Sequence, residues 1–543
     1  MTAGLAWGAQ PYRAPHAMVV SGERNASETG ARVLQAGGNA MDAAVAVGFA
    51  LGVTHSGMTG LGGGGYILVR LADGSTDFFD FRERAPGKSS RAMFLDAKGN
   101  LSPDVVTGWR AAAVPGNVRG FELAHRKFGS RPWAELLQPA IKLAAKGHPL
   151  SYMRAQALRG VESLSKDPES KRIFLKNGSY NQPGDLLVQP ELARTLQRIA
   201  RLGAADFYEG ESARLLAAEM TRHGGLITLA DLKDYKVSER RPLTGRYKGL
   251  EVITASGSSS GGVGLLQMLG ILEGSGYEKS GAGAAASIHF MAEAMRRCFA
   301  DRADSFGDPD FFRVPYDRLL DRQYLASLRK SIDPDHATPS SRIRSGVLMS
   351  REGSDTTHFA VVDQAGNAVA VTVTLNSAFG SGVTVPGLGF VLNNNMDNFA
   401  ANPGKTNHYG LVQGEANAIE PGKRPVSSMT PTIVVRDGKL LMVVGTPGGP
   451  TIVNSVLQAL VNVVDFKMNA QDAVSAPRFH HQWYPDRLFL EPGFSPDTIA
   501  LLRSRGHEIE FKGSNNDMMM ILTEAGWLQG GVDPRREGKA AGY

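Results

Sequence analysis

The chain has 543 residues, 42% of them hydrophobic and 21% charged, which is typical of a globular protein with a large core. Its net charge is +6, but the basic residues are dispersed, so nucleic-acid binding is not indicated and at most a mild attraction for small anionic substrates is expected. The longest apolar run, Met41 to Val53, is too short to span a membrane, so we expect a soluble protein.

Residues 25–54 predict two helices separated at Gly37-Gly38, the second apolar on nearly all sides and therefore buried. The following segment, 56–65, contains the spacing G-x-G-x-x-G. A dinucleotide-binding loop needs a strand before this spacing and a helix after it. Here a helix precedes and a strand follows, so the glycines are interpreted as close backbone packing at a turn.

The runs YILVRL and TDFFDFRERAP predict a hairpin around residues 72–74, with Arg82 at the end of its second strand. Functional side chains often gather at such ends, although a solvated or salt-bridged arginine is the alternative. Residues 115–330 are predicted to be largely helical. Within them, the Gly/Ser stretch 255–264 is either a flexible linker or an ordered turn, and Cys298, the only cysteine, is interpreted as a small buried hydrophobe.

Residues 332–355 carry Pro, Ser, Gly and scattered charge without a helical or strand period, which is typical of an exposed loop that is easily cut. The two β-rich runs THFAVVD and AVAVTVTLN follow, joined by a short turn at Ala365 and Gly366. This hairpin brings Thr374 opposite Thr356 or Thr357. On the return strand valines alternate with Thr372, Thr374 and Asn376, which therefore share one face.

Thr356 is the first residue of this hairpin. If the Asp355–Thr356 bond is cut, Thr356 gains a free α-amine beside its own hydroxyl, so that nucleophile and general base belong to one residue. A threonine at the start of a strand is also ordinary β-propensity.

Downstream, Asp437-Gly438 marks a two-residue hairpin turn, and the strand after it ends in GTPGG before a helix that begins near Pro450 or Thr451. Gly448 and Gly449 would leave backbone N–H groups free at the positive end of that helix. Such amides suit the oxyanion of an acyl-transfer reaction, and a plain strand-to-helix turn is the alternative. The tail alternates strand and helix.

These features together resemble the γ-glutamyltranspeptidase (glutathione hydrolase) family of N-terminal-nucleophile hydrolases. The matching segments follow the family's order along nearly the whole chain: DFRERAP (80–86), AVPGNVRGF (113–121), MAEAMRRCFADRADSFGDPDF (291–311), TTHFAVVDQAGNAVAVTVTLN (356–376), RPVSSMTPTIVV (424–435), GTPGG (445–449) and APRFHHQW (476–483). The resemblance implies an α+β protein, a four-layer αββα sandwich. It also implies one intertwined body made of two self-cleaved segments, 1–355 and 356–543, which form a heterodimer.

The resemblance implies a role for each site residue. Thr356 attacks the carbonyl of Asp355 during self-cleavage and afterwards the γ-glutamyl carbonyl of glutathione or a related compound, and water or an amino acid or peptide amine resolves the acyl-enzyme. Thr374 positions the hydroxyl of Thr356, and Gly448 and Gly449 hold the oxyanion. The implied substrate contacts are Arg82 on the α-carboxylate with Ser427 and Ser428, Asn376, Asn395 and Asn398 toward the amino end, and Tyr409 as the gate of a lid loop, 403–414. No metal or organic cofactor is implied, and His480-His481 lack the spacing of metal ligands.

One segment departs from the family. Where members usually read NNQMDDF or NNEMDDF, this chain reads NNNMDNF, so Asn398 replaces the aspartate that pairs with the substrate α-ammonium. A neutral anchor is expected to be weaker by about 1 kcal/mol or more. This leaves open an acylase of the same family that accepts glutaryl-type groups, as cephalosporin acylases do.

Three hypotheses therefore stand: a γ-glutamyl hydrolase and transpeptidase, a related acylase with altered acyl specificity, and an unprocessed binding protein that never exposes its nucleophile. Denaturing gels separate the third from the first two, and γ-glutamyl and glutaryl anilides separate those two. No signal peptide is visible, so the sequence indicates a cytoplasmic protein, or an exported one if a leader was removed.

Overall fold

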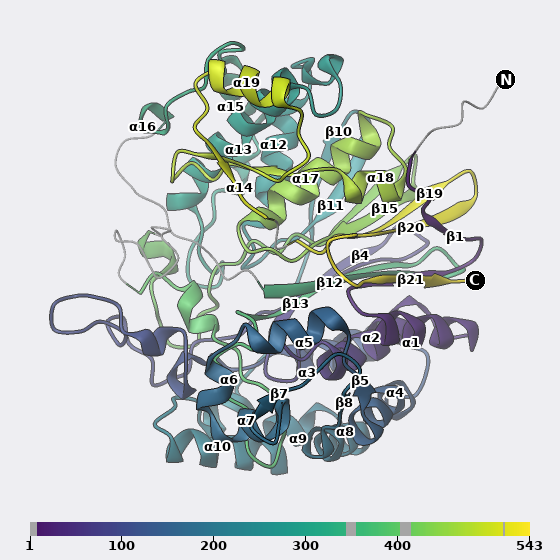
Figure 1. The fold of residues 1–543 in the computed structure, drawn as a ribbon, viewed down its shortest axis with the longest axis vertical. Coiled ribbons are helices and arrows are strands. Elements are labelled where there is room, and N and C mark those ends of the chain that lie inside the picture. The colour runs from purple at the N-terminus through teal and green to yellow at the C-terminus, as the bar shows by residue number, and fades with distance from the viewer. Residues whose placement is uncertain (1–7, 344–354, 402–413, 514–515) are drawn as a thin grey trace.

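Two antiparallel sheets of seven strands form the centre of the molecule (Figure 1). The computed structural model describes residues 8–343, 355–401, 414–513 and 516–543. One sheet, called here the hairpin sheet, has the order β21 (Lys539–Gly542), β2 (Met18–Ser21), β12 (Asp355–Val362), β13 (Ala368–Asn376), β3 (Gly64–Arg70), β4 (Thr76–Phe81) and β9 (Ser238–Arg240). The facing sheet has the order β1 (Tyr12–Ala14), β20 (Trp527–Val532), β19 (Met519–Glu524), β15 (Lys439–Gly445), β14 (Thr432–Arg436), β11 (Leu250–Thr254) and β10 (Leu243–Tyr247).

Helices cover the outer face of each sheet, so the layers run helix, sheet, sheet, helix (Figure 1). Below the hairpin sheet lie α1 (Arg24–Gln35), α2 (Ala40–Thr54), α3 (Asn117–Phe128), α4 (Trp133–Lys146) and α8 (Pro190–Leu202). Above the facing sheet lie α12 (Gly261–Leu272), α13 (Ala285–Ser305) and α17 (Thr451–Val464). The predicted α+β sandwich of four layers is confirmed.

Shorter elements surround these layers. The remaining α-helices are α5 (Tyr152–Arg159), α6 (Ser163–Lys166), α7 (Pro168–Phe174), α9 (Ala204–Tyr208), α10 (Glu211–Arg222), α11 (Leu229–Lys233), α14 (Tyr316–Leu319), α15 (Arg322–Lys330), α16 (Ser340–Ile343), α18 (Ala470–Ser475) and α19 (Pro496–Ser504). Small sheets pair β5 (His148–Pro149) with β8 (Leu186–Leu187), β6 (Leu175–Lys176) with β7 (Ser179–Tyr180), and β16 (Phe479–His480) with β17 (Leu488–Leu490) and β18 (Ile509–Phe511).

The alternation of side chains along the hairpin sheet builds two cores at once. Val369, Val371 and Val373 point outward and pack with the helices around α2, whereas Ala368 and Ala370 point inward and pack in the core that the facing sheet shares. A period of two along a strand buried on both faces produces this division. The inward face of β13 is the one that carries the threonines.

The helix break at Gly37-Gly38 is confirmed, and α2 is almost wholly buried, as its apolar sequence predicts. A capping box at its start satisfies the first backbone amides, because Asn39 and Asp42 bond to each other's backbone nitrogens. The expectation for 115–330 needs amendment, since this stretch also supplies β9, β10 and β11 to the two large sheets. The Gly/Ser stretch is an ordered turn, in which the Ser260 amide donates to Ser427 O at 2.8 Å.

Part of the segment ahead of the hairpin is anchored, contrary to the expectation of an exposed loop over all of 332–355. Ser340 is fully buried. Its amide donates to Asp486 Oδ2 at 2.7 Å and its hydroxyl to Trp483 O at 2.6 Å. Local sequence does not predict this, because both partners lie more than a hundred residues downstream. Residues 344–354 lie outside the described residues.

Each large sheet contains strands from both sides of the Asp355–Thr356 bond. In the hairpin sheet β12, β13 and β21 come from residues 356–543, apart from Asp355 itself, and β2, β3, β4 and β9 from the preceding part. A cut at this bond would therefore leave two segments held by interstrand hydrogen bonds and a common core.

Candidate active site

The register of the hairpin places Thr356 directly opposite Thr374, as one of the two predicted registers requires. The next pair is Asp355 with Asn376, so Leu375 is an extra residue on β13 and forms a β-bulge. Asn376 has φ +81°, a backbone conformation that asparagine tolerates better than most residues. The bulge turns the Asp355 carbonyl toward the side chain of Thr374.

Three hydrogen bonds converge on the Thr374 hydroxyl. Thr356 Oγ1 donates to Thr374 Oγ1 at 3.0 Å, and the Asn376 amide donates to the same oxygen at 2.7 Å. Thr374 Oγ1 in turn donates to the Asp355 carbonyl oxygen at 2.9 Å. Thr356 is only 6% exposed. One hydroxyl therefore orients the candidate nucleophile and polarises the carbonyl that precedes it.

Glycines at the start of β3 let it pair closely with β13 of the hairpin. A Cβ atom on Gly63 would lie 2.2 Å from the Thr374 carbonyl oxygen, and one on Gly65 would lie 2.2 Å from that of Thr372. Real Cβ atoms do not come so close to backbone, so these positions require glycine. The glycine run is thus used for close backbone packing, as the order of its flanking elements predicts.

A hydrogen-bonded row of side chains leads from the hairpin to Arg82, just after β4. Asn398 Nδ2 donates to Asn376 Oδ1 at 2.7 Å, and Arg82 Nη2 donates to Asn398 Oδ1. The backbone of Arg82 is held as well, since its amide donates to Asp80 Oδ1 at 3.1 Å and its carbonyl accepts from Tyr235 Oη at 3.0 Å. Three of the predicted substrate contacts therefore lie together.

Glu83 extends the row and was missed by the sequence reasoning, although it lies inside the DFRERAP motif. Arg82 Nη1 donates to Glu83 Oε2 at 3.1 Å, and Asn395 Nδ2 donates to Glu83 Oε1 at 2.6 Å. Burial raises the pKa of the Glu83 carboxyl to about 7, while Arg82 and Asn395 oppose the rise. The acidic group closest to Arg82 in this row is thus Glu83, while position 398 carries a neutral amide.

The two predicted serines differ in their bonding. Ser427 Oγ accepts from the Met429 amide at 3.1 Å, whereas Ser428 Oγ is buried and has no hydrogen-bond partner among the described residues. A buried hydroxyl without a partner is costly in a folded protein unless a ligand satisfies it. Ser428 is therefore the serine with spare hydrogen-bonding capacity.

The GTPGG turn lies against the start of the hairpin and is followed by α17. Pro447 lines one cavity together with Asp355 and Thr356. Gly448 and Gly449 have φ values of +136° and +57°, and a Cβ on Gly448 would lie 2.3 Å from Asn516 Nδ2. Neither of their amides donates to an acceptor in the described ranges. Among those residues the turn therefore leaves two N–H groups without a partner at the N-terminal end of α17.

The remaining predictions have different outcomes. Tyr409 and most of the proposed lid loop lie outside the described residues. Cys298 is buried, as expected, and burial raises the pKa of its thiol well above the usual value. Sequence reasoning missed His55 and Asp517, which line the Pro447 cavity with Thr356. No local signal could have found this pair, because the two residues are hundreds of positions apart in the chain. His55 follows α2, which packs on the hairpin sheet, and Asp517 precedes β19 of the facing sheet.

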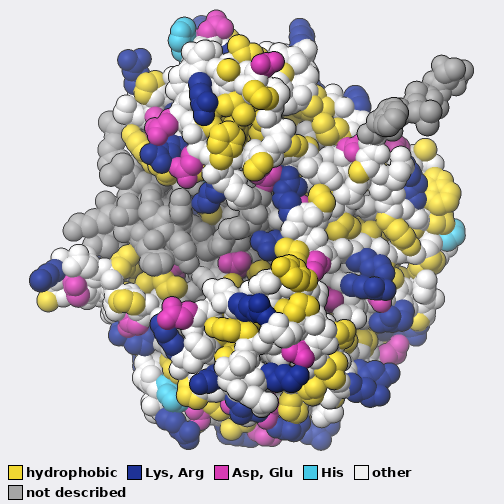
Figure 2. Space-filling view, in the orientation of Figure 1, with side chains coloured by type: hydrophobic (Ala, Val, Ile, Leu, Met, Phe, Trp, Pro, Cys, Tyr) yellow, Lys and Arg dark blue, Asp and Glu magenta, His cyan; other side chains and the backbone are white. Residues whose placement is uncertain are grey.

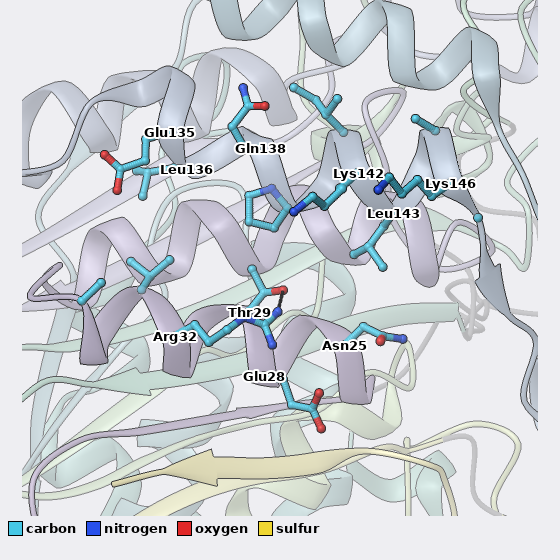
Figure 3. Close-up of a pocket in the computed structure, with 16 residues that line it drawn as sticks. Asn25, Glu28, Thr29, Arg32, Glu135, Leu136, Gln138, Lys142, Leu143 and Lys146 are labelled. Atoms are coloured by element: carbon cyan, nitrogen blue, oxygen red, sulfur yellow. Dashed lines mark hydrogen bonds between the residues drawn. The ribbon is translucent and has the colours of Figure 1, made fainter.

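A separate groove of about 930 Å³ lies between α1 and α4 (Figure 3). Its walls carry Arg32, whose guanidinium donates to Thr29 at 3.1 Å, with Lys142 and Lys146 on the opposite helix. None of the predicted site residues that the structure describes lines it. Figure 2 shows Lys and Arg side chains scattered over one face of the molecule.

In the portion of the chain that the structure describes, no helix is both long enough and apolar enough for a membrane crossing.

Comparisons with known proteins agree on one family. The family model described as gamma-glutamyltranspeptidase matches residues 26–543. The glutathione hydrolase proenzyme of Escherichia coli is 47% identical over 538 residues, covering 98% of this chain and 93% of the relative. The acylase ACY 1 proenzyme of Pseudomonas sp. strain SE83 is 39% identical over 509 residues, covering 92% and 88%. The crystal structure of cephalosporin acylase from Bacillus halodurans matches with a TM-score of 0.87 at 27% identity, covering 100% of this chain and 99% of that one.

Proposed function

The chain belongs to the γ-glutamyltranspeptidase family, and we propose that it cuts itself before Thr356 and then hydrolyses and transfers γ-glutamyl groups. The observation that carries the proposal is the bond from Thr356 Oγ1 to Thr374 Oγ1, and from there to the Asp355 carbonyl. Nucleophile, orienting hydroxyl and scissile carbonyl are thereby joined before any substrate arrives.

Self-cleavage is the first step. Thr356 Oγ1 attacks the carbonyl carbon of Asp355, whose oxygen is already polarised by the Thr374 hydroxyl. The C–N bond breaks, an ester forms, and water hydrolyses it. The products are residues 1–355 and the remaining 543 − 355 = 188 residues. They stay together as a heterodimer, since both contribute strands to each large sheet.

Cleavage gives Thr356 its own general base. The free α-amine accepts the hydroxyl proton as Oγ1 attacks the γ-carbonyl of the donor, which is the activation typical of an N-terminal threonine. The amides of Gly448 and Gly449 stabilise the oxyanion, because they are unpaired among the described residues and lie at the start of α17. Water, or the amine of an amino acid or peptide, then resolves the ester.

Recognition of the γ-glutamyl donor rests on Arg82 and on the side chains that are hydrogen-bonded to it. The guanidinium pairs with the α-carboxylate of the donor, a charge-assisted contact for which arginine is well suited. Ser428 adds a hydroxyl that has no other partner in the part of the chain that the structure describes. Asn376, Asn395 and Asn398 face the amino end, and Ser427 holds the serine turn in place. Tyr409 is proposed as the gate of the lid loop.

A second candidate is an acylase for glutaryl-type side chains, and one observation favours it. Asn398 donates to Asn376 and accepts from Arg82, so position 398 offers no negative charge to an α-ammonium. The similarity to an acylase proenzyme and to a cephalosporin acylase is consistent with this alternative.

Two measurements test the proposal. Wild-type protein should run as two bands on a denaturing gel and Thr356→Ala as one. The cleaved protein should release anilide faster from a γ-glutamyl than from a glutaryl anilide. The reverse preference would favour the acylase, and a single wild-type band unchanged by Thr356→Ala would favour an unprocessed binding protein.

A further inference from the structure

A small cavity adjoins the bond that is proposed to be cut. Its volume is about 20 Å³, and its walls are His55, Met58, Arg154, Asp355, Thr356, Pro447, Asp517 and Arg536. A cavity needs about 10–15 Å³ to hold one water, provided that two to four polar groups bind it. The space is therefore suited to a single water beside Asp355 and Thr356.

Polar groups without partners lie in this cavity and beside it. His55 and Asp517 are 3% and 5% exposed. Both ring nitrogens of His55, Asp517 Oδ1 and Thr357 Oγ1 have no hydrogen-bond partner among the described residues. A Cβ built on Gly22 would lie 2.6 Å from Asp517 Oδ2 and 3.4 Å from both His55 Cε1 and Thr357 Oγ1, so the three side chains lie around the same backbone position.

Self-cleavage needs a proton acceptor that the hydroxyl network does not supply. Before the cut, the nitrogen of Thr356 is an amide and cannot act as a base. Thr374 Oγ1 already accepts two hydrogen bonds and donates to the Asp355 carbonyl. A hydroxyl with both lone pairs occupied orients the attack but cannot hold a proton.

We propose that Asp517 is the general base of self-cleavage, acting through a water that His55 holds in this cavity. The inference rests on the proposed cleavage before Thr356. A neutral imidazole has one donor and one acceptor nitrogen, so His55 can fix the water from one side while Asp517 accepts from it on the other.

The step balances without a further reagent. As Thr356 Oγ1 bonds to the Asp355 carbonyl carbon, its proton passes to the water, which gives a proton to the Asp517 carboxylate. The C–N bond then breaks, and the same proton returns through the water to the departing Thr356 nitrogen. In the second half, one water adds to the ester, the Oγ1–C bond breaks, and Thr356 regains its hydroxyl proton while Asp355 leaves as a carboxylic acid.

The surrounding charges support these two roles. Burial, together with Asp533, raises the pKa of Asp517 to about 7, against the opposing effect of the nearby arginines. Burial, followed by Arg154 and Arg536, holds the pKa of His55 well below its usual value, so the ring is neutral. The charged and titratable groups that act on the pair are Arg154 of α5, Arg536 and Asp533 after β20, and Arg478 before β16. A base whose pKa lies near the working pH is the most effective one.

The test follows cleavage of the full-length chain made by cell-free translation and sampled on denaturing gels at a series of pH values around neutrality. Wild type should cleave faster as the pH rises, with a midpoint at about 7. Asp517→Asn should cleave at least about tenfold more slowly, which is a modest part of the rate acceleration that general-base catalysis contributes. Its cleavage rate should also lose the midpoint near neutrality. His55→Gln should slow cleavage but keep the midpoint, because the base is still present.

Controls separate a chemical role from a structural one. Asp465→Asn removes another buried carboxylate, which bonds Tyr247, Tyr277 and Lys248 away from the cavity, and should keep the wild-type rate and midpoint. Asp355→Asn removes the carboxylate at the cut itself. Rates are taken on the protease-resistant, folded fraction of each variant.

A wild-type rate and midpoint in Asp517→Asn would overturn the inference and leave the proposed function intact. So would a midpoint that disappears in Asp355→Asn but not in Asp517→Asn. A wild-type chain that never cleaves would instead overturn the proposed function itself.

Discussion

The guanidinium of Arg82 donates to the side-chain oxygen of Asn398, whose nitrogen donates in turn to Asn376 Oδ1 at 2.7 Å. Asn398 thus links the proposed carboxylate anchor to the bulge beside Thr356. A neutral amide can bond both neighbours at once, with Arg82 as its donor and Asn376 as its acceptor. An aspartate could accept from Arg82 but could not donate to Asn376.

This relationship predicts the effect of Asn398→Asp. A carboxylate would attract the α-ammonium of a γ-glutamyl donor, so KM should fall by about five- to tenfold, equivalent to ~1 kcal/mol. Initial rates with a γ-glutamyl anilide measure this, and a glutaryl anilide, which has no α-amine, is the control that should not improve. An unchanged KM for both substrates would mean that Asn398 does not contact the amino end.

Arg82→Ala should lower kcat/KM for donors with an α-carboxylate by about ten- to hundredfold, the range expected for one charge-assisted contact. Self-cleavage should persist, because within the described ranges the hydrogen bonds of the Arg82 side chain go to Glu83 and Asn398. Arg110→Ala removes the same charge from a pair with Asp104 and is the matched control. If Arg82→Ala arrests cleavage on gels, the residue has a folding role instead.

Thr374→Ala should slow self-cleavage by about a hundredfold, as the loss of one oxyanion donor does in other enzymes. The substitution removes both the acceptor of the Thr356 hydroxyl and the donor to the Asp355 carbonyl. Thr374→Ser keeps the hydroxyl and should cleave at close to the wild-type rate. Equal rates for the alanine and serine variants, read from gel time courses, would contradict this role.

Ser428→Ala and Ser427→Ala form a matched pair. Ser428 Oγ has no partner among the described residues, so its loss should lower kcat/KM by about tenfold, as expected for a bond to a charged group, and leave the melting temperature unchanged. Ser427 Oγ accepts from the Met429 amide, so its loss should cost about 1 kcal/mol of stability. A melting temperature that falls more for Ser428→Ala would reverse the assignment.

Glu83 predicts a pH dependence of stability. Burial raises the pKa of its carboxyl from 4.5 to about 7, so between these values the folded chain binds a proton that the unfolded chain releases. This contribution is fully present below about pH 4.5 and is lost as the pH rises through about 7, with an upper limit of about 3 kcal/mol. Unfolding of wild type and Glu83→Gln at several pH values should show the wild-type advantage shrinking over that range. A difference that is constant or grows with pH would contradict the raised pKa.

Local pattern was sufficient for much of this molecule. The hairpin around Ala365 and Gly366, the break at Gly37-Gly38 and the helix after Gly449 all depend on residues close in the chain. Turn chemistry and side-chain period encode such features directly. The family's motifs placed Arg82 and Thr374 among the candidate residues as well.

Other features depend on residues distant in the chain. Packing against distant strands and loops decides which residue pairs with Thr374, where the bulge at Leu375 forms, and how Ser340 is anchored. Glu83 was adjacent to a recognised residue, but only its burial, against the opposing effect of Arg82 and Asn395, gives its carboxyl a pKa near neutrality.

By itself, the sequence determined the hairpins, the helix break at Gly37-Gly38, the candidate nucleophile and the missing charge at position 398. The tertiary structure decided which polar groups share one enclosed space, since His55, Thr356 and Asp517 come from three distant parts of the chain. The reason is physical. Side-chain periodicity and turn chemistry act over a few residues, whereas polar groups lose water and are left without hydrogen-bond partners only when the packed layers enclose them.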